Sequence, residues 1–100
     1  TTVIFDEIDS GVSGEIGSKM GKILKSMSRY NQIICITHLP QIASLGSSHY
    51  KVFKYIKNDI TSTSINKLTY DDRITEIARM LSGEVINKEA IANAKKMLDI

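Results

Sequence analysis

A chain of 100 residues is long enough for one small domain, and its 42% hydrophobic and 24% charged residues are ordinary for a water-soluble globular protein. The formal net charge of +2 is too small to argue by itself for a nucleic-acid partner. A single cysteine, Cys35, excludes an intrachain disulfide. Because no apolar run approaches the ~20 residues that cross a bilayer, we expect no membrane partner.

The chain begins with an apolar stretch, residues 2–5, which predicts a short buried strand because it is continuous and rich in β-branched side chains. The stretch ends in three carboxylates, Asp6, Glu7 and Asp9, and a loop of small residues follows at positions 10–14. Negative charge at the tip of a buried strand indicates a function beyond folding.

A helix is expected next, with Ser13 as its N-cap. Its apolar residues recur at helical spacing and should face inward: Ile16, Met20, Ile23, Leu24 and Met27. Gly17 and Gly21 within it should let the helix approach a neighbouring segment closely. The stretch "QIICIT", residues 32–37, predicts a second buried strand, followed by a turn and a short helix.

The second half predicts a β-hairpin and two helices. The hairpin strands are expected at residues 49–57 and 60–68, with Asn58 and Asp59 at the tip. A helix follows at residues 71–81. The expected inward positions there are Ile74, Ile77, Ala78 and Leu81, with Gly83 just past the end. In the last helix, which Asn87 can cap, they are Ile91, Ala94 and Leu98.

The strand, helix, strand order of the first half predicts a right-handed crossover between parallel strands. Ligands of open α/β sheets bind outside the carboxyl ends of such strands. The first strand ends in Asp6 and Glu7, and the second in Thr37 and His38. These four polar side chains should therefore lie together at one edge of the sheet.

An apolar strand closed by Asp-Glu is typical of a Walker B element. The aspartate of such an element holds Mg²⁺ beside nucleotide phosphates, and the glutamate can act as a general base toward water. A histidine after the neighbouring strand can reach the γ-phosphate. The structural alternatives are a solvated strand end for Asp6 and Glu7 and a backbone-capping role for His38.

Three stretches make the interpretation more specific: "VIFDEIDSGVSGE", "QIICITHLPQIASLGSSHY" and "RITEIARMLSG". In order and spacing they resemble the C-terminal end of the RecN family of bacterial DNA repair proteins, in the SMC-like group of ABC-type ATPases. The resemblance implies an α/β fold. It would be the C-terminal part of a P-loop NTPase head, with parallel strands and a crossover helix, then a hairpin and two helices.

The resemblance also implies residue roles. Asp6 would be the Walker B aspartate that binds nucleotide-bound Mg²⁺, and Glu7 and His38 would be catalytic. A D-loop that crosses between two heads would contain four residues: Ser10, Gly11, Val12 and Ser13. ATP and Mg²⁺ would be the cofactors of the longer protein. Ser13 stands where many ABC proteins have aspartate, so the contacts of this loop cannot be copied from transporters.

No G-x-x-x-x-G-K-[ST] phosphate loop and no ABC signature motif occur in the sequence. We therefore expect residues 1–100 to be a segment of an ATPase head, inactive by itself and without bound nucleotide. A strand that is apolar on both faces, at residues 3–5, predicts that the chain self-associates when its neighbours are missing.

The function implied by the resemblance is ATP-dependent recombinational repair of DNA double-strand breaks. DNA and recombination proteins would be partners, the heads would form a homodimer, and the location would be the bacterial cytoplasm, at the nucleoid.

Two alternatives stay open. A metal-dependent nuclease could use Asp6 or Glu7 together with Asp9, although this leaves "THLPQ" unexplained. A non-catalytic interaction module could instead bind a partner through the hairpin and the last helices. The hairpin lysines could touch DNA phosphates or protect an exposed sheet edge: Lys51, Lys54, Lys57 and Lys67.

Overall fold

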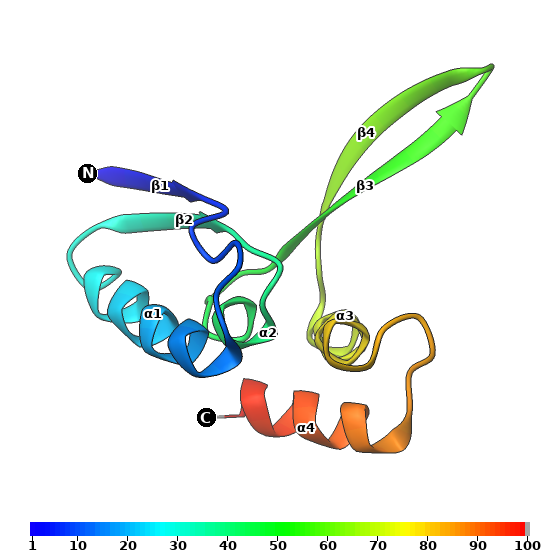
Figure 1. Cartoon of the computed structure of the whole chain (residues 1–100). Coiled ribbons are helices and arrows are strands. Elements are labelled where there is room, and N and C mark those ends of the chain that lie inside the picture. Colours follow the sequence, from blue (N-terminus) through cyan, green and yellow to red (C-terminus); the bar gives the residue numbers. More distant parts are fainter. Residues whose placement is uncertain (100) are drawn as a thin grey trace.

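The computed structural model describes residues 1–99, which form two small sheets and the helices that surround them (Figure 1). The elements follow in the order β1 (Thr2–Asp6), α1 (Gly14–Met27), β2 (Gln32–Ile36), α2 (Pro40–Ala43), β3 (Tyr50–Lys57), β4 (Ile60–Lys67), α3 (Tyr70–Ser82) and α4 (Lys88–Leu98).

β1 and β2 pair in parallel, and α1 connects them along one face of the pair (Figure 1). Ser13 begins the helix as predicted, since its hydroxyl accepts a hydrogen bond from the backbone N–H of Ile16 at 3.4 Å. The predicted α/β architecture, with parallel strands and a crossover helix, is confirmed for this part of the chain.

The prediction that both strands are buried is wrong in this chain. Ile4 is 63% exposed, and Ile34 on the neighbouring strand is 44% exposed. The reason is that α1 covers one face of the pair, whereas the apolar side chains of the other face stay largely exposed. Both strands therefore alternate between exposed and partly buried positions.

The buried face of α1 is made by Gly17, Gly21 and Leu24, whereas Ile16 and Ile23 are exposed, contrary to the predicted inward positions. The helix backbone comes close to the segment around α2 at these two glycines. A Cβ on Gly17 would lie 2.7 Å from a methyl carbon of Leu39. The prediction that these glycines permit a close approach is confirmed.

β3 and β4 form the predicted antiparallel hairpin, which projects away from the helices (Figure 1). Asn58 and Asp59 make its two-residue turn, with φ of 53° and 62°. Positive φ at both positions is what a tight hairpin turn of matching twist requires. Each strand is one residue shorter at the open end than predicted.

The best-buried apolar cluster lies between α3 and α4. Ile77, Ala78 and Ala94 are fully buried, and Ile74 and Ala90 complete the cluster. Leu81 is 37% exposed rather than inward. Two predicted helix ends are confirmed. Gly83 follows the C-terminus of α3 with φ 84°, and Asn87 caps the N-terminus of α4.

Arg73 joins this cluster to the first half of the molecule. From α3 its guanidinium donates to the carbonyl oxygens of Ala43 at 3.2 Å and Gly46 at 2.9 Å. These carbonyls lie at and just beyond the end of α2, where helices leave acceptors without partners. Arg73 thus holds the segment after His38 against α3.

Candidate functional site

The ends of β1 and β2 meet at one edge of the parallel pair, as the topology predicts. Asp6 lies beside Ile36 in the strand register, and the backbone N–H of Glu7 donates to the carbonyl oxygen of Ile36 at 2.9 Å. Thr37 and His38 follow Ile36 directly. The two polar strand ends are therefore fixed side by side by backbone hydrogen bonds.

The chain turns sharply at the end of β1. Glu7 has φ 53°, in the left-handed region that residues other than glycine rarely adopt. Non-glycine residues persist in such conformations where the surrounding structure holds them, often at functional sites. Asp6 and Glu7 are both exposed, so their carboxylates face solvent at this edge.

Asp9 lies inside the molecule, although it follows the same turn. It is only 1% exposed. Its Oδ2 atom accepts hydrogen bonds from the hydroxyl of Thr37 and, at 3.2 Å, from the backbone N–H of His38. Its Oδ1 atom lies 3.5 Å from Nδ1 of the His38 ring. Asp9 therefore connects the loop after β1 to the loop after β2.

The environment of Asp9 favours the ionised carboxylate. Burial alone would raise its pKa, but hydrogen bonds from Thr37 and from backbone N–H groups, together with nearby His38, lower the pKa below its ordinary value. The sequence did not distinguish this residue, which was only one of three carboxylates after a strand. The partners that identify it lie 28 and 29 residues away.

His38 is mostly exposed, and its position is set by its neighbours. Its side chain has 58% of its surface exposed. The hydroxyl of Thr37 donates to Asp9 and also accepts from the backbone N–H of Leu39 at 3.1 Å. Pro40 then begins α2, where its fixed φ suits the first helical turn. His38 is thus held on a short, hydrogen-bonded loop rather than a free one.

The loop from Ser10 to Ser13 runs from the turn to α1. Gly11 has φ 74°, and the backbone N–H of Val12 donates to the carbonyl oxygen of Asp9 at 3.1 Å. Ser10 and Gly11 are exposed, and Val12 is half-buried. The hydroxyl of Ser13 caps α1, whereas the side chain of Ser10 is exposed to solvent.

No cluster of three His, Cys, Asp or Glu side chains suited to a metal ion occurs in residues 1–99. Mg²⁺ usually needs only one or two carboxylates, with phosphates and water as its other ligands. The exposed carboxylate of Asp6, at the carboxyl edge of the parallel pair, would suit that mode of binding.

A groove of about 430 Å³ is lined by His38 together with residues of β3 and α3. The residues from β3 and α3 include three charged side chains that pair with one another. Glu76, from α3, pairs with Lys51 of β3, with 2.9 Å between Oε2 and Nζ, and also with Arg79. The lining residues are Ile36, Thr37, His38, His49, Lys51, Val52, Glu76, Arg79 and Met80.

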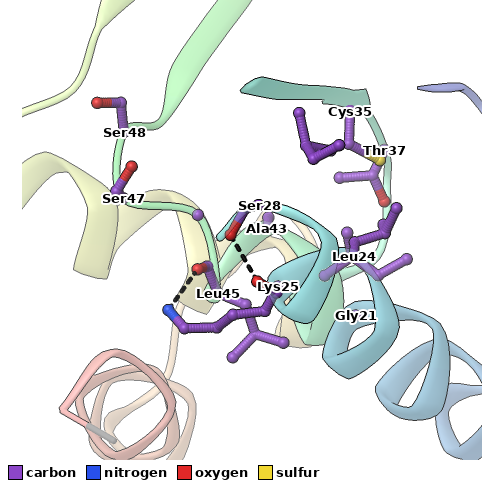
Figure 2. Close-up of a pocket in the computed structure, with 13 residues that line it drawn as sticks. Gly21, Leu24, Lys25, Ser28, Cys35, Thr37, Ala43, Leu45, Ser47 and Ser48 are labelled. Atoms are coloured by element: carbon purple, nitrogen blue, oxygen red, sulfur yellow. Dashed lines mark hydrogen bonds between the residues drawn. The ribbon is translucent and has the colours of Figure 1, made fainter. Parts of the chain in front are cut away.

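A smaller hollow, about 190 Å³, lies between β2, α1 and the segment after α2. Figure 2 shows the ammonium group of Lys25 reaching across it to the carbonyl oxygen of Leu45, a distance of 3.1 Å. Cys35 lines it from β2, and burial together with the charge of Asp9 raises the pKa of the thiol. A raised pKa disfavours the thiolate, which is the reactive form of cysteine.

Comparison with known proteins gives consistent matches. The DNA repair protein RecN of Haemophilus influenzae is 41% identical over 99 residues, covering 99% of this chain. RecN of Xylella fastidiosa is 44% identical over 97 residues, covering 97% of this chain, and RecN of Bacillus subtilis is 35% identical over 98 residues, covering 98%. This chain is a RecN-like sequence. The RecN-like chain spans only 17–18% of the length of these relatives, and no family model matches it.

A solved structure shares the fold. A chain from a study of the ATP-driven dimerization and DNA-stimulated activation of SMC ATPases superimposes with a TM-score of 0.64 at 13% identity. The match covers 84% of the RecN-like chain and 50% of the SMC chain. The predicted α/β fold, with a parallel strand pair, a hairpin and two following helices, is therefore confirmed as one that the chain shares with part of an SMC ATPase. Among the helices of residues 1–99, none combines the length and apolar character that crossing a membrane would require.

Proposed function

We propose that this chain supplies the hydrolytic edge of an SMC-like ATPase head in a RecN-like DNA repair protein. The observation that carries the proposal is the pairing of the two strand ends, in which the backbone N–H of Glu7 donates to the carbonyl oxygen of Ile36, two residues before His38. Glu7 and His38 thus both lie at the carboxyl edge of a parallel strand pair, where ligands bind in open α/β sheets. The RecN relatives and the SMC fold support the same assignment.

In this proposal the residues have distinct roles. Asp6 would hold Mg²⁺, which would neutralise charge on the β- and γ-phosphates. Glu7 would accept a proton from the attacking water as a general base. His38 would contact the γ-phosphate. The exposed turn at Ser10 and Gly11 would begin a D-loop that meets a second head.

The partners follow from the same proposal. The printed name of the relatives is DNA repair protein, and the SMC ATPases of the structural match are described as dimerizing with ATP and being activated by DNA. We infer that the longer RecN-like protein binds ATP and Mg²⁺, forms a head-to-head homodimer, and acts on DNA double-strand breaks with recombination proteins. It would do so in the cytoplasm, at the nucleoid.

The nuclease alternative finds no support at this edge. That reading needs Asp9 to share a metal with Asp6 or Glu7. Asp9 is instead 1% exposed, and its Oδ2 atom already accepts two hydrogen bonds. A purely non-catalytic interaction module remains the competing hypothesis, which the next experiment separates from the ATPase.

The experiment uses a chimera in which this chain replaces the matching segment of the Haemophilus influenzae RecN. Glu7→Gln should retain ATP binding and lower ATP turnover by about 10²- to 10⁴-fold, because an amide cannot accept the proton. Glu15→Gln, an equal charge change on exposed α1, should leave turnover unchanged. Turnover at the parent rate in Glu7→Gln would refute the role given to Glu7.

A further inference from the structure

The proposed function does not explain why the carboxylate of Asp9 is buried. A carboxylate that is 1% exposed is costly unless charged or hydrogen-bonding partners compensate it. Oδ2 has two such partners in Thr37 and the backbone of His38. Oδ1 is buried and has no hydrogen-bond partner among residues 1–99. A buried polar atom without such a partner requires an explanation, and a functional role is one of those known.

We propose that Asp9 is the positioning residue of His38, which it orients through the backbone N–H and through Nδ1 of the ring. The inference rests on the proposed function for the role of His38 toward phosphate. It assigns to Asp9 a role that the sequence pattern does not give it, since the pattern singles out only Asp6 and Glu7.

The geometry carries the inference in two steps. First, Oδ2 fixes the backbone of His38, so the loop cannot swing away from the end of β1. Second, the unsatisfied Oδ1 lies 3.5 Å from Nδ1, close enough for a small rotation of the ring to complete a hydrogen bond. Functional hydrogen bonds are often long in ligand-free proteins and shorten when the ligand binds.

The chemistry follows from the two nitrogens of the ring. A carboxylate that accepts Nδ1–H sets the tautomer and the orientation of a histidine. Nε2, on the opposite edge of the ring, is then left for another partner such as a phosphate oxygen or a water. Because the environment of Asp9 keeps it ionised, it can act as this acceptor throughout the neutral range.

The first test is made on this chain alone and does not depend on ATP. Long-range ¹H–¹⁵N spectra at alkaline pH, where an ordinary histidine is neutral, report which nitrogen of His38 carries the proton. We expect Nδ1 to carry it in the parent chain and the mixture of a free imidazole in Asp9→Asn. Protonation at Nε2 in the parent chain would overturn the proposal without any variant.

Thr37→Val is the control that separates positioning from general disruption of the loop. It removes a hydrogen bond to Oδ2 but leaves Oδ1 facing the ring. We expect a lower melting temperature with the Nδ1 tautomer retained. If Thr37→Val changes the tautomer as much as Asp9→Asn does, the carboxylate has no specific role and the proposal fails.

The second test measures coupling in the RecN chimera. Carboxylate partners of metal-binding histidines are typically worth about 10- to 100-fold in metal affinity or activity; by analogy, Asp9→Asn should lower kcat about tenfold with little change in KM. In a His38→Ala background the same substitution should have almost no further effect. An equal loss in both backgrounds would refute positioning through His38, whereas failure of the proposed function itself would appear separately, as full activity of Glu7→Gln.

Discussion

Glu76 forms an ion pair with Lys51, with 2.9 Å between Oε2 and Nζ, and this contact joins α3 to the base of the hairpin. The carboxylate is buried, and Arg79 from its own helix is its second partner. Burial alone would raise the pKa of Glu76, but the hydrogen bonds from Arg79 and Lys51 lower it below its ordinary value. The pair also forms the wall of the groove beside His38.

Lys51→Met should therefore destabilise the chain, because Glu76 keeps its burial and loses one of its charged partners. We expect a loss of about 1 kcal/mol in the free energy of unfolding, limited by the partial exposure of Lys51 and by the remaining Arg79. Lys54→Met, the same change on an exposed position of β3, should have a much smaller effect. Urea unfolding measures the difference, provided that the dependence of the unfolding free energy on urea concentration is the same in both variants. Equal midpoints for both variants would contradict the prediction.

Gly21→Ala and Gly17→Ala should differ, although both residues lie on the buried face of α1. A Cβ at position 21 would lie 3.0 Å from the backbone carbonyl oxygen of Gln41, which cannot move aside, whereas the nearest atom at position 17 is the flexible end of Leu39. We expect Gly21→Ala to lose about 1–2 kcal/mol, since overpacking outweighs the gain in helix propensity. Gly17→Ala should be nearly neutral. Thermal unfolding of both variants tests which one loses more stability, and a larger loss in Gly17→Ala would contradict the prediction.

His49 should make stability depend on pH in the mildly acidic range. Burial, and then the charge of Arg73, lower its pKa below the ordinary 6.5, while Glu76 opposes the shift. Between pH 6.5 and the folded-state value, the unfolded chain therefore binds a proton that the folded chain does not. Stability must fall as pH decreases below about 6.5, by at most about 1.4 kcal/mol per pH unit. His49→Gln should flatten this slope in urea unfolding, and an unchanged slope would assign it to other groups.

The uncovered face of the parallel pair should make the chain self-associate. Ile4, Ile34 and Ile36 are 63%, 44% and 49% exposed on this face. Strands of parallel sheets are normally covered on both faces, and an apolar patch of this kind is an association surface. Light scattering at micromolar concentration should show a dimer or larger species. Ile34→Lys should shift it toward monomer, whereas Val85→Lys, 81% exposed in the loop after α3, should not. A monomeric parent chain would refute the prediction.

The isolated chain should not bind ATP at micromolar concentrations. Phosphate loops supply backbone N–H groups and a lysine that give most of the affinity for the phosphates, and no such motif occurs in these 100 residues. Titration calorimetry with Mg²⁺ and ATP should show no saturable heat. Stoichiometric binding would mean that the edge at Asp6 and Glu7 holds nucleotide without a phosphate loop.

Much of the local structure could be predicted because its signals lie within a few residues of each other. Ser13 and Asn87 cap their helices through N–H groups three residues later. Asn58 and Asp59 make the hairpin turn because both tolerate positive φ. The strand, helix, strand order brought Glu7 and His38 to one edge, since the topology of a crossover leaves little choice.

The tertiary structure decided which side chains are buried and with what partner. Three carboxylates lie at or just after the end of β1, yet only Asp9 turns inward, because Thr37 and His38, nearly 30 residues away, offer it hydrogen bonds. Glu76 of α3 is likewise buried, at the point where β3 brings Lys51 to it. Local patterns thus determined the elements and the exposed catalytic candidates. Only the packing of distant segments decided the buried charges, because the cost of burying a charge depends on partners that sequence spacing does not reveal.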